Sequence, residues 1–121
     1  MTQLSSNAAL PESSADMRRW PRYPIDVRVR ATVRTGNTDR TVYGRGTELG
    51  KGGIAAVLPI ELAVGDTIKV DITPPYCAQS FTLAAVVRNR SSFTYGLEFT
   101  SISSAEQIEI ERVCRLLLIL Q

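Results

Sequence analysis

Residues 25–34 alternate strictly between apolar and polar side chains. The apolar positions are Ile25, Val27, Val29, Ala31 and Val33, and the polar positions are Asp26, Arg28, Arg30, Thr32 and Arg34. A period of two places successive side chains on opposite sides of a β-strand. This segment is therefore predicted to be a half-buried strand, with its apolar face on a core and its charged face in solvent.

Five more strands are predicted by similar patterns and by the turn residues between them. They cover residues 40–49, 54–58, 68–72, 81–87 and 93–99. Gly44 and Gly46 interrupt the second of these six strands, which suggests a bulge or a close approach of the backbone. The polar residues 88–92 are predicted to connect the last two strands.

The C-terminal segment changes period. Val113, Leu116, Leu117 and Leu120 recur at helical spacing, and Ser103 and Glu106 form a capping-box pattern ahead of them. The predicted fold is mainly β: a small six-stranded antiparallel barrel with a C-terminal α-helix that covers an opening or forms a partner surface. Because residues 116–120 are apolar nearly all round, we expect a monomer or a weak homodimer through this helix.

Length and composition fit one globular domain. The chain has 121 residues, of which 44% are hydrophobic and 21% are charged, and domains most often have about 100–150 residues. Residues 1–16 are rich in Ser and Ala without periodicity and are predicted to be a flexible N-terminal arm. The domain is expected to span residues 17–121, and its length leaves no room for an output domain.

The sequence lacks the residues that several classes of function require. The sequence has no histidine and only two cysteines, Cys77 and Cys114, so neither a metal site nor a disulfide framework is expected. The carboxylates are scattered, and we predict no enzymatic activity and no cofactor. The N-terminus does not resemble a signal peptide, and the apolar run at 116–120 is too short to span a bilayer. A cytoplasmic protein without membrane insertion is expected.

An arginine cluster precedes the first predicted strand. Residues 17–24 read MRRWPRYP, and the first 60 residues carry nine Lys and Arg against five Asp and Glu. The cluster is compatible with a solvated tail, a nucleic-acid clamp, a partner surface or a phosphate grip. Any anion site should draw on this half of the chain.

Two motifs narrow these alternatives. Arg18-x-x-x-Arg22 leads into the first strand, and Glu48-Leu-Gly-Lys-Gly-Gly53 joins the second strand to the third. With the six-strand pattern, this order resembles the PilZ domain, a bacterial module that binds cyclic di-GMP. The family has R-x-x-x-R and then [D/N]-x-S-x-x-G; here Glu48 stands at the acidic or amide position, Gly50 at the serine position, and Gly53 matches.

The resemblance implies a cyclic di-GMP receptor or adaptor in bacterial second-messenger signalling. Its implied ligand-binding residues are Arg18, Arg19, Arg22, Glu48, Gly50 and Gly53. The arginine segment would become ordered around the ligand, and the altered surface would signal to a protein effector by contact.

Two alternatives remain beside this reading. One is a degenerate PilZ-like adaptor that binds no nucleotide. The other is a basic barrel for single-stranded nucleic acid, which requires exposed aromatic residues interleaved with arginines. Most aromatic residues are expected on the inner strand faces, and Arg28, Arg30 and Arg34 on a solvated face, so no nucleic-acid polymer is expected as a partner.

Overall fold

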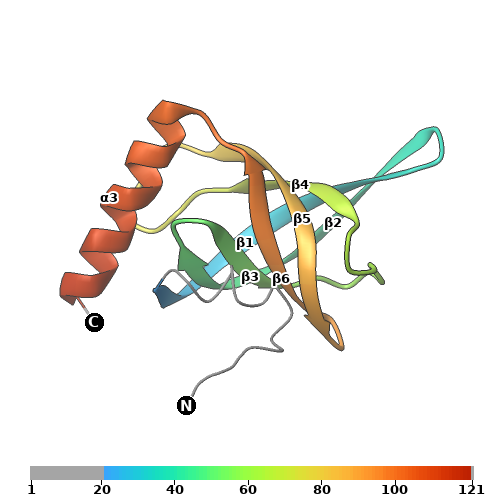
Figure 1. The fold of residues 1–121 in the computed structure, drawn as a ribbon, viewed down its shortest axis with the longest axis horizontal. Helices are drawn as coiled ribbons and strands as arrows, with labels where there is room; N and C mark the ends of the chain where they lie inside the picture. The colour runs from blue at the N-terminus through green and yellow to red at the C-terminus, as the bar shows by residue number, and fades with distance from the viewer. Residues whose placement is uncertain (1–20, 121) are drawn as a thin grey trace, which may run out of the picture.

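A closed antiparallel barrel dominates the computed structural model, which describes residues 21–120 (Figure 1). Its strands are β1 (Arg22–Thr35), β2 (Thr38–Gly50), β3 (Gly53–Val57), β4 (Thr67–Ile72), β5 (Phe81–Ser91) and β6 (Thr94–Ser101). They follow the order β1-β2-β3-β6-β5-β4, and antiparallel pairing of β1 with β4 closes the barrel. The predicted six-stranded antiparallel barrel with one C-terminal helix is confirmed.

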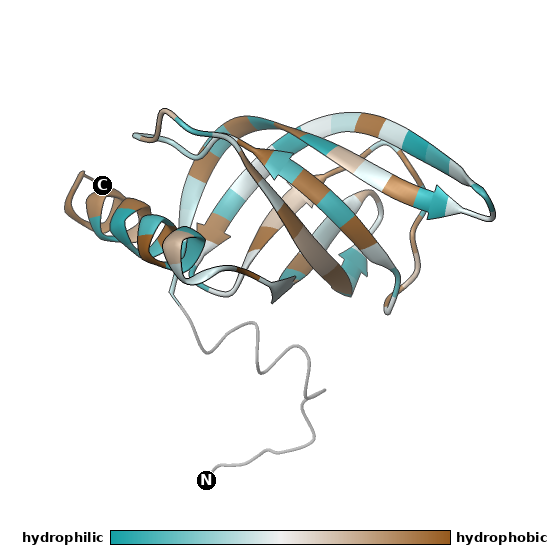
Figure 2. Cartoon of the chain, turned by 90° about the horizontal axis from the view of Figure 1, so that it is seen from above, coloured by the Kyte–Doolittle hydropathy of each residue, from teal (hydrophilic) through white to brown (hydrophobic). Residues whose placement is uncertain are grey.

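The alternation in β1 has the predicted effect on burial. Val29, Ala31 and Val33 lie in the core, whereas Arg28, Arg30 and Arg34 are exposed. Figure 2 shows the same alternation of hydrophobic and hydrophilic residues along the other strands. Each strand therefore contributes one apolar face to a single core inside the barrel.

Helix α3 (Ser104–Leu120) lies at one end of the barrel (Figure 1). Its residues Ile110, Val113, Cys114 and Leu117 join the barrel core. The predicted capping box is present: the Ser103 amide donates to Glu106 Oε1 at 3.0 Å, and the Glu106 amide donates to Ser103 Oγ at 3.1 Å. Among residues 21–120, α3 does not have the length and apolar character needed to cross a membrane.

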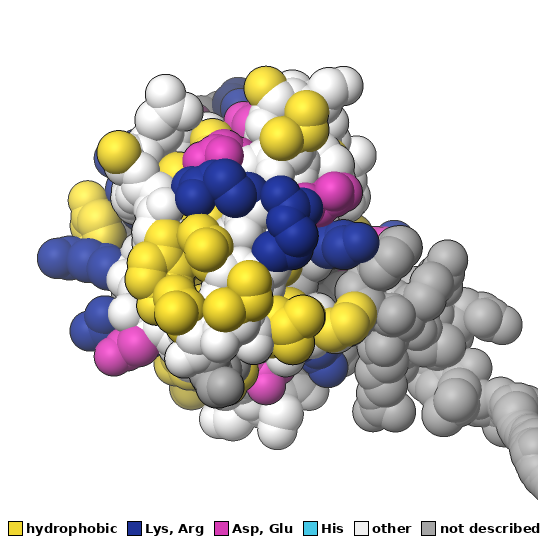
Figure 3. Space-filling model, turned by 90° about the vertical axis from the view of Figure 1, so that its left-hand side faces the viewer, with side chains coloured by type: hydrophobic (Ala, Val, Ile, Leu, Met, Phe, Trp, Pro, Cys, Tyr) yellow, Lys and Arg dark blue, Asp and Glu magenta, His cyan; other side chains and the backbone are white. Residues whose placement is uncertain are grey.

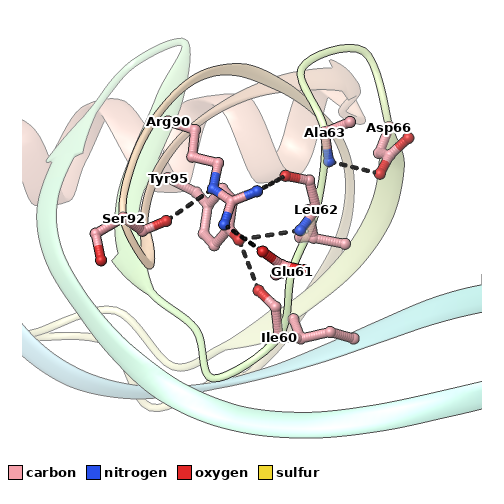
Figure 4. A network of polar contacts seen from close by, with 8 residues as sticks. All are labelled: Ile60, Glu61, Leu62, Ala63, Asp66, Arg90, Ser92 and Tyr95. Carbon is pink, nitrogen blue, oxygen red and sulfur yellow. Dashed lines mark hydrogen bonds and ion pairs between the residues drawn. The ribbon is translucent and has the colours of Figure 1, made fainter.

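A polar network holds the loop between β3 and β4 in place (Figure 4). The buried Tyr95 hydroxyl donates to the Ile60 carbonyl at 2.6 Å and accepts from the Leu62 amide at 3.0 Å. Arg90 donates to the Leu62 carbonyl at 2.9 Å. One buried tyrosine thus satisfies two backbone groups of a loop that has few ladder partners.

The connection between β5 and β6 is shorter than predicted. Residues 88–91 belong to β5, and the turn lies at Ser92, whose φ is +57°. The apolar residues of β5 end at Val87, and the pairing register with β6 shifts between Val87 and Asn89. Backbone pairing nevertheless continues as far as Ser91. Phe93, predicted to begin the sixth strand, therefore lies in the turn with 44% of its surface exposed.

The glycines of β2 have the predicted role. An ideal Cβ on Gly44 would lie 2.0 Å from the Val57 carbonyl oxygen, so β2 and β3 approach too closely there for a side chain. The β2–β3 register also shifts between Gly46 and Glu48. The strand continues through both glycines, which accommodate a close approach and a bulge.

Candidate functional site

The end of the arginine segment meets the glycine turn at one end of the barrel. Arg22 pairs with Gly50 across β1 and β2, and Gly50 pairs with Gly53 across β2 and β3. Gly53 in turn pairs with Glu98 on β6. Residues from both sequence motifs therefore form one continuous row across four strands.

Arg22 and Glu48 carry opposite charges beside this row. Arg22 Nη1 lies 3.8 Å from Glu48 Oε1, and the two side chains are 29% and 46% exposed. A long ion pair between partly exposed groups contributes only about 0–1 kcal/mol. Both groups can consequently exchange this contact for a ligand at little cost.

Gly50 has a local reason to lack a side chain. An ideal Cβ there would lie 2.9 Å from the Pro21 carbonyl oxygen and 3.2 Å from Arg22 Cγ. A serine at position 50 would collide with the segment that leads into β1. The missing hydroxyl and the close passage of Pro21 are therefore linked.

Gly53 is constrained even more strongly. Its ideal Cβ would lie 2.2 Å from the Leu97 carbonyl oxygen, which belongs to the backbone of β6. Because backbone atoms in a paired strand cannot move aside easily, packing alone requires glycine at this position. This structural requirement accompanies any role of Gly53 in a ligand site.

A second charged pair lies on the same outer face. Arg88 of β5 bonds to Glu98 of β6, which is the neighbour of Gly53 in the pairing. Between Glu48 and this pair the outer residues are small: Glu48 pairs with Ala55, and Ala55 pairs with Gly96. Glu98 was not among the predicted site residues, although alternation with the inward Leu97 could have placed it on the outer face.

The turn at Lys51 lies close to α3. Burial raises the pKa of the Cys114 thiol, and the positive charge of Lys51 opposes this rise. The helix also packs against β1 and β2. A change in the β2–β3 turn is therefore in position to affect α3.

Four of the six predicted site residues come together at this end of the barrel: Arg22, Glu48, Gly50 and Gly53. Arg18 and Arg19 lie outside the described residues, as does the predicted boundary between residues 16 and 17. Within residues 21–120 there is no group of acidic or sulfur ligands arranged for a metal ion. The arrangement offers a guanidinium and a carboxylate to a ligand.

Comparison with known families decides the assignment. The family model of the PilZ domain matches residues 16–116. The chain belongs to the PilZ family. None of the curated proteins matches it significantly.

Solved PilZ structures share the fold. The PilZ domain of YcgR from Escherichia coli, solved with c-di-GMP, superposes with a TM-score of 0.63 at 16% identity, covering 83% of this chain and 90% of that one. The PilZ domain of CeSA from a cellulose-synthesizing bacterium gives 0.59 at 19% identity, covering 83% and 97%. The inhibitor of motility MotI from Bacillus subtilis gives 0.62 at 20% identity, covering 84% of this chain but 51% of MotI.

Proposed function

We propose that this PilZ domain is a cyclic di-GMP receptor. The observation that carries the proposal is the meeting of Arg22 with Glu48 and Gly50, which brings the two PilZ motifs to one surface. The PilZ domain of YcgR was solved with c-di-GMP, which supports the same ligand for this chain. The proposed site comprises Arg18, Arg19, Arg22, Glu48, Gly50 and Gly53.

The residue types match the two chemical parts of the ligand. A guanidinium can donate two parallel hydrogen bonds to a phosphate or to O6 and N7 of guanine. The Glu48 carboxylate accepts from N1–H and N2–H on the opposite guanine edge. Backbone amides of the Gly50–Gly53 turn can approach a phosphate closely because no side chains intervene.

Binding must compensate for ordering the arginine segment. Fixing five residues costs about 5–10 kcal/mol at about 1–2 kcal/mol each, and each hydrogen bond to a charged group returns about 1.5–3 kcal/mol. Several arginine contacts therefore have to form together. Pro21 and Pro24 reduce the cost because they restrict the unbound chain.

A second candidate function is a protein-interaction adaptor that binds no nucleotide. Two observations favour it: Arg22 already contacts Glu48, and Gly50 supplies no hydroxyl. In this case the ion pair would fix the start of β1 rather than open for a ligand.

Calorimetric titration of the purified chain with cyclic di-GMP distinguishes the two candidates. The receptor gives saturable heat with a dissociation constant in the micromolar range or below. Absence of heat, together with no displacement of a fluorescent cyclic di-GMP analogue at high micromolar ligand, would leave the adaptor. Arg34→Ala is a matched control, because Arg34 is an exposed arginine near the far end of β1 that pairs with Asp39.

The proposed receptor acts in the cytoplasm and passes its signal to a protein effector by contact. Helix α3 is the proposed output surface, because it lies beside the β2–β3 turn. Exposed hydrophobic side chains gather on the face of the molecule seen in Figure 3, and Ile108, Leu118, Ile119 and Leu120 of α3 are 59–73% exposed. This surface would also mediate a weak homodimer.

A further inference from the structure

A groove opens on the outer face of β1, β2 and β3, apart from the residues of the proposed nucleotide site. It has a volume of about 670 Å³, and its lining includes Arg28, Tyr43, Gly44, Arg45, Val57 and Phe93. The lining shares no residue with the row formed by Arg22, Gly50 and Gly53. The groove therefore needs an explanation of its own.

The walls of the groove are side chains that remain open to solvent: Tyr43 is 51% exposed, Val57 40% and Phe93 44%. Tyr43 and Phe93 depart from the inward placement expected of most aromatic residues, because Phe93 lies in a turn and Tyr43 on the outer face of β2, whereas Tyr23, Phe81, Tyr95 and Phe99 lie in or against the core. Together Tyr43, Val57 and Phe93 form apolar walls suited to a flat ring.

Arg28 supplies an available positive charge. Its guanidinium carbon lies 4.6 Å from the centre of the Tyr43 ring, and no carboxylate within residues 21–120 lies at ion-pair distance from it. A guanidinium stacked on an aromatic face keeps its in-plane N–H donors free for an anion.

The neighbouring arginines are differently placed. Arg45 pairs with Asp26 at 3.3 Å, and both side chains are more than half exposed. Arg30 pairs with Asp71 at 2.5 Å and Arg34 with Asp39 at 3.6 Å. These aspartates offset most of the charge on this face, so it lacks the run of free cations that a nucleic-acid backbone requires. A small ligand with one anionic group fits this balance.

We propose that the groove binds a planar aromatic ligand that carries an anionic group. The ring packs between Tyr43, Phe93 and Val57, and the anionic group accepts hydrogen bonds from Arg28 with support from Arg45. A nucleoside monophosphate and an aromatic carboxylate share this chemistry. This site is independent of cyclic di-GMP binding at the other end of the strands.

NMR titration of the ¹⁵N-labelled chain tests the proposal. The probes are GMP and indole-3-acetate, with inorganic phosphate and neutral indole as partial ligands. The proposal requires a ring and an anionic group in one molecule, as in the two complete probes, GMP and indole-3-acetate. At least one of these two should shift the amides of Tyr43, Val57 and Phe93 with a dissociation constant on the order of 1 mM or tighter. Binding by GMP alone identifies a nucleotide site, and binding by indole-3-acetate alone an aromatic acid site.

Variants distinguish binding in the groove from non-specific attraction of an anion to the positive charges of this face. Arg28→Ala should weaken binding at least fivefold, Arg28→Lys less, and Tyr43→Ala at least threefold, whereas Arg34→Ala should have no effect. Phosphate binding as tightly as the complete probes, or equal effects of Arg28→Ala and Arg34→Ala, would overturn the proposal. So would an absence of shifts with both complete probes, or their displacement by cyclic di-GMP, which would make the groove part of the other site.

Discussion

Arg22 Nη1 lies 3.8 Å from Glu48 Oε1, although these residues belong to two motifs that are far apart in the sequence. Pairing of Arg22 with Gly50 holds them at the same end of the barrel. This contact is long and partly exposed, so both side chains remain able to bind a ligand instead of each other.

Arg22→Ala should lower the affinity for cyclic di-GMP at least tenfold, because it removes charge-assisted hydrogen bonds worth about 1.5–3 kcal/mol each. Glu48→Gln should also weaken binding, since the amide has one acceptor oxygen instead of two. Calorimetry measures both affinities, with Arg34→Ala as the control. Unchanged affinity in Arg22→Ala with an intact fold would remove this residue from the site.

Gly53→Ala should lower the free energy of unfolding by about 1–3 kcal/mol, because the added methyl group overlaps the Leu97 carbonyl. Gly36→Ala is the control: Gly36 has a φ of +62° but no neighbouring atom within 4 Å of its ideal Cβ. Urea unfolding followed by circular dichroism gives both values. A cost for Gly53→Ala no larger than that of Gly36→Ala, which carries only the strain of a positive φ, would contradict a severe overlap with the Leu97 carbonyl.

Gly50→Ser tests whether the family's serine can be restored. The new side chain would meet the Pro21 carbonyl oxygen, so we expect the start of β1 to shift and cyclic di-GMP affinity not to improve. Amide chemical shifts around Arg22 report the displacement, and calorimetry reports the affinity. A tighter complex with unshifted amides would show that the serine is accommodated.

Tyr95→Phe should destabilise the protein by about 1–3 kcal/mol, because the Leu62 amide and the Ile60 carbonyl both lose their buried partner. Tyr76→Phe changes the same group on a side chain that is 56% exposed, so it should cost less than about 0.5 kcal/mol. Thermal unfolding compares the two variants. Equal melting temperatures would contradict a stabilising role for the Tyr95 hydroxyl.

Glu109 should titrate unusually low. Hydrogen bonds from Arg112 and then from Cys77 lower its pKa from 4.5 to about 2. Because the folded-state pKa is below the ordinary value, this contribution to stability is present at neutral pH and is lost as the pH falls from about 4.5 towards 2. NMR titration of the side-chain carboxyl group should show Arg112→Gln raising the pKa and Arg115→Gln leaving it nearly unchanged.

Much of this architecture could be predicted from local patterns. Alternation in β1 and the Ser103–Glu106 capping box correctly indicated a strand and a helix start, because both depend on neighbouring residues. The position of Phe93 could not be predicted in the same way. It depends on how far β5 and β6 stay paired, and this pairing continues past the register shift between Val87 and Asn89 as far as Ser91.

The proposed site also has a part that could be predicted from the sequence and a part that could not. Its motifs are local in sequence, but the contact between Pro21 and Gly50 is decided by how two strands lie together. The groove beside Tyr43 could not be predicted from any local pattern, because its walls come from three strands and a turn.

Closure of the barrel limits how another protein can recognise this domain. Within residues 21–120 each strand is hydrogen-bonded to a neighbour on both sides along at least part of its length, so an incoming peptide cannot extend the sheet in the closed part of the barrel by adding a strand. Recognition of that part depends instead on side chains of the outer wall or of the helix. Partner choice can therefore change through surface substitutions that leave the backbone ladder intact.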